Sequence, residues 1–323
     1  MSPQGARRAE TPANAIHARR GLIGVAVGAL LASACTVLVM GTTDAATISG
    51  HSESTNAVST RVAPGDCLTW STPSASDLTR TDCANPHRFE VASAVDLSTQ
   101  FAPGSALPDA AALTQLRDSL CTPAVNTYLR GRFDPHGLFS VGLIDPGEAS
   151  WRAGQRTVRC GLQHVGVSGE QFPIQGRVSD LDQSDVAPVG SCEKISATLP
   201  ADPVDCARLH ASEVISVVDL GQKFPAAYPA VADQDTFLDE TCRAAADAVL
   251  GAPDAAATKG LTVFWGNLQP ESWAAGSRRV NCSVGKQLPG GGFAPTTGAA
   301  RSAPAVATTV PTPTVPTPTT AGR

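Results

Sequence analysis

The spacing of eight cysteines constrains the fold of this 323-residue chain more than any other feature of its sequence. Successive cysteines are separated by 16, 38 and 39 residues in a first quartet and by 14, 36 and 40 in a second. Agreement this close over about 100 residues indicates an internal duplication. The two quartets are Cys67, Cys83, Cys121 and Cys160, followed by Cys192, Cys206, Cys242 and Cys282.

The residues around the cysteines repeat as well. "TDCANPHRFEVASAVDL" at residues 81–97 matches "VDCARLHASEVISVVDL" at residues 204–220, and the pattern W-x-A-G-x-R-x-V-x-C occurs twice. We therefore expect two tandem domains. Their predicted ranges are residues 61–165 and 187–286, separated by a linker at 166–186 that is rich in Gly, Ser and Asp without helical or strand periodicity.

The hydrophobic pattern changes period in the same order within each repeat. Alternating apolar residues predict strands at 89–97 and 214–220, and apolar residues three or four apart predict a helix that carries the third cysteine. The predicted apolar faces are Leu113, Leu116 and Leu120 in the first helix, and Phe237, Thr241, Ala245 and Val249 in the second. Strand-like segments follow each helix. The fold class is therefore α+β, with about β-β-β-α-β-β in each domain.

The N-terminal region predicts a membrane anchor. Residues 21–40 form an uncharged run that would rise about 30 Å as a helix, which matches the hydrocarbon core of a bilayer. Four arginines precede this run within residues 1–20, so that basic segment is expected in the cytoplasm. The predicted location is the cell membrane with a single span, a linker at 41–60 and extracytoplasmic domains.

Three other interpretations of this region stay open. Cleavage after Ala45 would release a secreted protein, Arg19 and Arg20 loosely resemble a twin-arginine signal, and Cys35 loosely resembles a lipoprotein processing site. All three place most of the chain outside the cytoplasm. At the other end, the Pro- and Thr-rich residues 287–323 predict a disordered tail.

An extracytoplasmic compartment and matched, even numbers of cysteines favour disulfides. Three connectivities are possible in each domain. We favour a disulfide between the first and second cysteines, because both lie in an early hairpin. We favour another between the third and fourth, because the helix that carries the third cysteine can pack on the last strand, which carries the fourth. Disulfides that close loops of this size each stabilise a domain by roughly 3 to 4 kcal/mol in the chain-entropy model.

Metal binding is the competing interpretation of the cysteines. Cys83 with His87, and Cys206 with His210, have a C-x3-H spacing, and Glu90 and Glu213 add a carboxylate. The other cysteines stand alone without a second nearby ligand, so no metal and no cofactor is expected. The two histidines and the two glutamates are predicted to have structural roles.

The motifs of common enzyme classes are missing from the sequence. It contains no G-x-S-x-G, H-E-x-x-H, phosphate-binding glycine loop or C-x-x-C. His87 and Glu90 are expected to point to opposite faces of a strand, which disfavours a base and its orienting carboxylate. We expect no catalytic residues. Nucleic-acid binding is excluded as well, because the net charge is −5 and no basic run lies outside the first twenty residues.

Trp151 and Trp273 begin the repeated W-x-A-G-x-R pattern and are predicted to fill the core just before the closing strand, with exposed ligand stacking as the alternative. Arg156 and Arg278, five residues later, are expected either to stack on the indole rings or to pair with Glu148 and Glu271.

Taken together, "PGDCL", "DCANPHRFEV", Cys121 and "PGEASWRAGQRTVRC" resemble the septum formation-related domain family of actinobacteria, and "DCARLHASEV", Cys242 and "PESWAAGSRRVNC" repeat the resemblance. The second copy has "GSC" for "GDC" and Leu209 before its histidine. The resemblance implies a membrane-anchored, non-enzymatic binding or scaffold protein of the cell envelope, with an envelope protein or ligand as partner and a link to septum formation. It supplies no catalytic residues. The alternative is a secreted or lipid-anchored envelope protein with hydrolase or metal-binding activity.

Overall fold

The computed structural model describes residues 62–72 and 75–301. The predicted segments 1–20, 21–40 and 41–60 lie outside these residues, as does the predicted disorder from residue 302 onward. Within the described ranges, no helix combines the length and the hydrophobicity needed to cross a bilayer. The chain folds into two α+β domains, each built on a six-stranded antiparallel sheet.

The sheet of the first domain has the strand order β2-β1-β3-β5-β4, and β6 pairs with β5 beyond this path. Its strands are β1 (Cys67–Thr69), β2 (Thr79–Thr81), β3 (Phe89–Asp96), β4 (Ser140–Ile144), β5 (Thr157–Val165) and β6 (Gln171–Phe172). Its helical segments are α2 (Ala110–Leu116), a π-helical turn η1 (Arg117–Cys121), α3 (Thr122–Tyr128), α4 (Gly147–Arg152) and a 3-10 turn η2 (Val178–Asp180).

The sheet of the second domain repeats this topology with the order β8-β7-β9-β11-β10, and β12 pairs with β11. Its strands are β7 (Cys192–Ser196), β8 (Leu199–Val204), β9 (Ser212–Asp219), β10 (Thr262–Trp265), β11 (Arg279–Gln287) and β12 (Phe293–Ala294). Its helices are α5 (Leu220–Lys223), α6 (Val231–Leu250), α7 (Ala255–Thr258) and α8 (Pro270–Ala275). The matching order is what a duplicated gene segment predicts. Both domains add a short helix, α4 or α8, and a sixth strand, β6 or β12, to the expected β-β-β-α-β-β, and the second domain also has α5 and α7.

The helix that carries the third cysteine differs between the domains. In the second domain α6 is continuous, and its buried row is Gln234, Leu238, Cys242, Ala246 and Leu250. The predicted row from Phe237 lies one position from the centre of this face: Phe237, Ala245 and Val249 are only partly buried against the core, because the disulfide of Cys242 directs the neighbouring row inward. In the first domain the helix is interrupted by η1, where the Thr122 amide donates to the Arg117 carbonyl. Pro123 follows directly, and its missing amide and its ring disfavour a regular α-helical turn there.

The segment 166–186 differs from the linker that its composition predicts. It forms β6 and η2 against the first domain, and it buries Ile174 and Val178. The disordered tail predicted for residues 287–323 is wrong over residues 287–301, which pack against the second domain in the same way and form β12, where Phe293 is buried. In each case the apolar residues are irregularly spaced among polar residues, Gly and Pro, so they produce no periodic signal even though they complete the core. We call residues 171–180 and 293–301 the returning segments.

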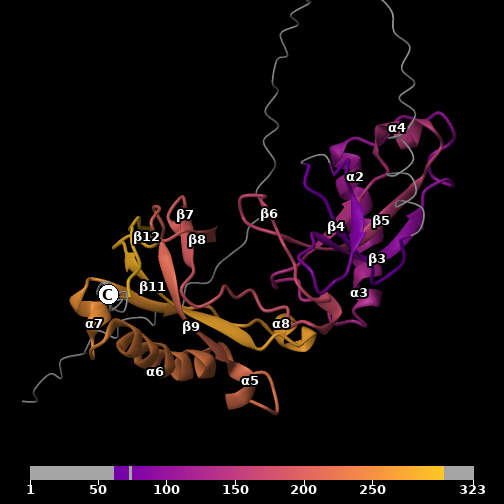
Figure 1. Cartoon of the computed structure of the whole chain (residues 1–323). Coiled ribbons are helices and arrows are strands. Elements are labelled where there is room, and N and C mark those ends of the chain that lie inside the picture. The colour runs from indigo at the N-terminus through magenta and orange to yellow at the C-terminus, as the bar shows by residue number, and fades with distance from the viewer. Residues whose placement is uncertain (1–61, 73–74, 302–323) are drawn as a thin grey trace, which may run out of the picture.

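The two domains contact each other through buried polar groups. The Asp134 carboxylate, 1% exposed, accepts hydrogen bonds from Ser272 Oγ at 2.9 Å and Ser277 Oγ at 2.5 Å. Ser272 lies in α8 and Ser277 follows it, and this helix lies on the side of the second domain that faces the first (Figure 1). Ser184 Oγ accepts from the Arg278 and Arg279 amides. Buried hydrogen bonds with fixed directions favour one relative orientation of the domains.

Candidate functional site

The predicted histidines and glutamates lie at the same place in both domains, where the first and third strands meet the returning segment. Cys67 on β1 is paired in register with Glu90 on β3, and Cys192 on β7 with Glu213 on β9. A disulfide joins Cys67 to Cys83 and another joins Cys192 to Cys206, with Cα separations of 5.3 and 5.1 Å. The other two join Cys121 to Cys160 and Cys242 to Cys282. This is the connectivity that the sequence favours.

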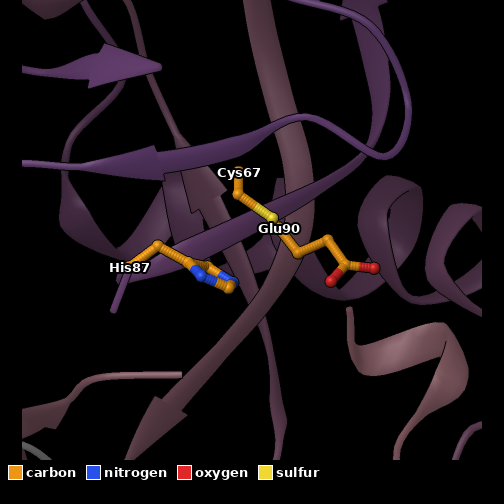
Figure 2. Close-up of side chains that lie close together, drawn as sticks. All are labelled: Cys67, His87 and Glu90. Atoms are coloured by element: carbon orange, nitrogen blue, oxygen red, sulfur yellow. The ribbon is translucent and has the colours of Figure 1, made fainter. Parts of the chain in front are cut away.

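In the first domain three buried side chains converge (Figure 2). Cys67 Sγ, a ring nitrogen of His87 and a carboxylate oxygen of Glu90 all lie within 4.8 Å of one another. The expectation that His87 and Glu90 point to opposite faces is therefore wrong. His87 lies before β3 begins at Phe89, so the alternation of side chains along a strand does not apply to it.

The imidazole of His87 is fully buried and uses only one of its nitrogens. Nδ1 lies 2.9 Å from the Asn85 carbonyl oxygen, and because a carbonyl can only accept, Nδ1 carries the proton. Nε2 then presents a lone pair, and it has no hydrogen-bond partner in the structure. A buried polar atom without a partner is rare enough to need an explanation.

Glu90 clamps the returning segment of the first domain. Its carboxylate accepts hydrogen bonds from the Tyr128 hydroxyl at 2.7 Å and from the Val178 amide at 2.6 Å. Burial, together with the hydrogen bond to Glu90, raises the pKa of the Tyr128 hydroxyl to about 12. The main chain of His87 also pairs with Ile174 in both directions, at 2.9 and 2.7 Å. The two residues thus hold the segment by its backbone.

Glu213 holds the returning segment of the second domain in a different way. It accepts from the Ala300 amide and forms an ion pair with Arg301 at 3.0 Å. His210 pairs with Thr296 through its main chain, and its Nδ1 lies 2.8 Å from the Arg208 carbonyl oxygen. A half-open pocket of about 280 Å³ borders this clamp and is lined by His210, Glu213 and Lys259 among others.

The repeated tryptophan–arginine pairs stack. The Arg156 guanidinium carbon lies 4.2 Å above the centre of the Trp151 ring, and the corresponding distance from Arg278 to Trp273 is 3.9 Å. Each arginine also donates to the carbonyl of its own tryptophan, at 2.6 and 2.7 Å. The structure therefore selects stacking over the alternative pairs with Glu148 and Glu271. Glu148 pairs with Arg152 instead.

Several residues of these sites carry no signal in the sequence. Tyr128 lies 38 residues from Glu90, and Val178 lies 88 residues from it. Asp134 and Ser277 are 143 residues apart. No spacing or periodicity connects such residues, so only the folded chain brings them together. The one available hint is that Tyr128 is one of only two tyrosines in the chain.

Comparison with known proteins identifies relatives without a described activity. A family model described as septum formation matches residues 64–282. Two proteins titled uncharacterized membrane protein, from the CDC 1551 and H37Rv strains of Mycobacterium tuberculosis, are each 41% identical to this chain over 256 residues. The match covers 77% of this chain and 57% of each relative, so the chain spans little more than half the length of these relatives. No solved structure matches.

Proposed function

Because the chain belongs to the septum formation family, we propose that it is a non-enzymatic binding or scaffold protein of the cell envelope that acts in septum formation. The interface around Asp134 carries this proposal. It joins two copies of one domain through three buried side chains. The two domains therefore have a defined relative orientation and do not move freely against each other. A scaffold needs such a fixed separation between its binding faces.

The roles of the glutamates support a structural assignment over a catalytic one. Glu90 accepts from the Val178 amide of the returning segment and from the Tyr128 hydroxyl of α3. Glu213 accepts from Ala300 and Arg301, both in the returning segment. A general base in an enzyme needs instead a position within reach of a substrate proton. The stacked arginines are likewise directed to main-chain carbonyls of their own domain.

The proposed location is the outer face of the cell membrane. Residues 21–40 would provide a single span with the preceding arginines in the cytoplasm, and the relatives are titled membrane proteins. Four disulfides suit an oxidising compartment. Two domains on one chain can also engage one envelope partner at two points and gain through effective concentration.

Fluorescence microscopy of dividing cells tests the septal role. A full-length chain with a C-terminal fluorescent protein that matures outside the cytoplasm is expected to concentrate at division sites. Asp134→Ala, which frees the two domains from each other, should reduce this enrichment. Asp233→Ala is the control, because Asp233 is an exposed aspartate in the first turn of α6. Uniform membrane fluorescence of the unmodified chain throughout division contradicts the septal role.

A further inference from the structure

The buried corner formed by β1, β2 and the start of β3 has the side chains of a metal site, and its cysteines are oxidised. We propose that, when the Cys67–Cys83 disulfide is reduced, this corner binds one zinc ion through Cys67, Cys83 and His87, with Glu90 as the fourth ligand. The intact disulfide and the zinc-bound dithiolate are then alternative states of one site.

The ligands come from short, rigid pieces of the chain. The β1–β2 hairpin brings the Cα atoms of Cys67 and Cys83 to 5.3 Å, and the β1–β3 register places Glu90 directly opposite Cys67. The objection from sequence, that Cys67 has no second ligand nearby, therefore does not hold in the folded domain. Two sulfurs, an imidazole nitrogen and a carboxylate oxygen are a donor set that suits tetrahedral zinc.

The unpartnered nitrogen of His87 points to a ligand. Nδ1 is held by the Asn85 carbonyl, which fixes the tautomer that leaves the Nε2 lone pair free. Histidines that bind metals commonly donate their other ring proton to a carbonyl in this way. Figure 2 shows the ring directed toward Cys67 and Glu90.

Glu90 is also arranged as a metal ligand would be. Both of its hydrogen bonds come from neutral groups, the Tyr128 hydroxyl and the Val178 amide, and they orient the carboxylate without neutralising it. A carboxylate has about four lone-pair sites, so each oxygen can still bind a cation. The equivalent Glu213 already has the cation Arg301 as its partner. We therefore assign the metal site to the first domain alone.

The redox step requires an external two-electron donor, such as a dithiol or a phosphine. The donor breaks the sulfur–sulfur bond and the cysteines become two thiols, while a dithiol becomes a disulfide or a phosphine takes oxygen from water to become its oxide. Zinc then displaces the two thiol protons, because only thiolate binds the metal. The cross-link between β1 and the segment after β2 is thereby replaced by coordination bonds.

Cobalt(II) titration of the reduced full-length chain tests the proposal. The chain is reduced with a phosphine under native conditions, and Co²⁺ is added anaerobically. We expect one Co²⁺ per chain, with a sulfur-to-cobalt charge-transfer band and the visible bands of a tetrahedral site. The oxidised chain should show neither. Zn²⁺ should displace the cobalt and should slow reoxidation of Cys67 with Cys83.

Matched variants assign the ligands. Cys67→Ser with Cys83→Ser should abolish these bands, whereas Cys192→Ser with Cys206→Ser removes the equivalent hairpin disulfide and should leave them unchanged. His87→Ala should weaken cobalt binding more than about 100-fold, beyond the effect of an outer-shell change, and His210→Ala should not affect it. Circular dichroism establishes that each variant is folded. Bands that persist in His87→Ala, bands that are equally strong in urea, or the absence of cobalt binding by the folded, reduced chain each overturn the proposal.

Discussion

Trp151 and Trp273 occupy the same position in the repeat but differ in burial. Trp151 is 1% exposed, and its Nε1 donates to the Ser105 carbonyl at 2.9 Å. Trp273 is only partly buried, with Arg278 on its face and Tyr228 at its edge. We predict that Trp151→Ala lowers the free energy of unfolding by about 3–5 kcal/mol. Trp273→Ala should lower the same free energy by a clearly smaller amount. Urea denaturation of the full chain measures both, and equal losses would contradict the difference in burial.

The carboxyl group of Glu193 on β7 should make the free energy of unfolding depend on pH. Burial, reinforced by the negative charge of Asp185, raises the pKa of its carboxyl above the ordinary 4.5, although the Ser212 hydroxyl donates to it. In the window between 4.5 and the raised value the folded state binds more protons than the unfolded state, so Glu193 makes the fold less stable as pH rises through that window.

Glu193→Gln should therefore raise the melting temperature at pH 7 by a few degrees, since each kcal/mol is worth about 2–4 °C at this size. The gain should disappear below pH 4.5, the ordinary carboxyl value. The amide oxygen of Gln can still accept from Ser212. Glu170→Gln, at an exposed position, is the control and should change little. A gain that persists at low pH would mean that the charge of Glu193 is not its cause.

At the scale of elements, each returning segment donates a backbone amide to one buried carboxylate, Glu90 in the first domain and Glu213 in the second. Glu90→Ala leaves the Val178 amide and the Tyr128 hydroxyl without their acceptor, and we expect a loss of about 1–3 kcal/mol. Hydrogen exchange should accelerate around residues 174–178 before the rest of the first domain opens. Glu213→Ala should have the same effect around residues 296–301. Unchanged exchange at Val178 in Glu90→Ala would show that β6, not Glu90, holds the segment.

For the whole molecule, the interface predicts that the two domains unfold together. Asp134→Ala removes the acceptor of both Ser272 and Ser277, which are themselves buried. Calorimetry should show one transition for the unmodified chain and two for Asp134→Ala, with the first at a lower temperature. Asp233→Ala, at an exposed position in the first turn of α6, should keep one transition. A single, unshifted transition in Asp134→Ala would rule out coupling through this carboxylate.

The repeat and the order of the main elements along the chain follow from the sequence because they are encoded locally and written twice, and the disulfide pairing that the sequence favoured among three possibilities is the one in the structure. Spacings between cysteines, alternation along residues 89–97 and three-to-four spacing in the helices need only neighbouring residues. The errors also have local causes. The row from Phe237 is nearly as apolar as the row from Leu238, and a disulfide decides between them. His87 stands two residues before its strand, where periodicity does not apply.

By itself, the sequence determined that the chain is a duplicated, cysteine-rich α+β protein, since the cysteine spacing and the hydrophobic periodicity set the repeat, the elements and their order. Only the tertiary structure decided which polar groups meet. Asp134 and Ser277 are 143 residues apart, and Glu90 and Val178 are 88 residues apart, in segments without any repeating pattern. Their pairing follows from the burial of hydrogen-bonding groups that must find partners once water is excluded, and this requirement acts only in the folded chain.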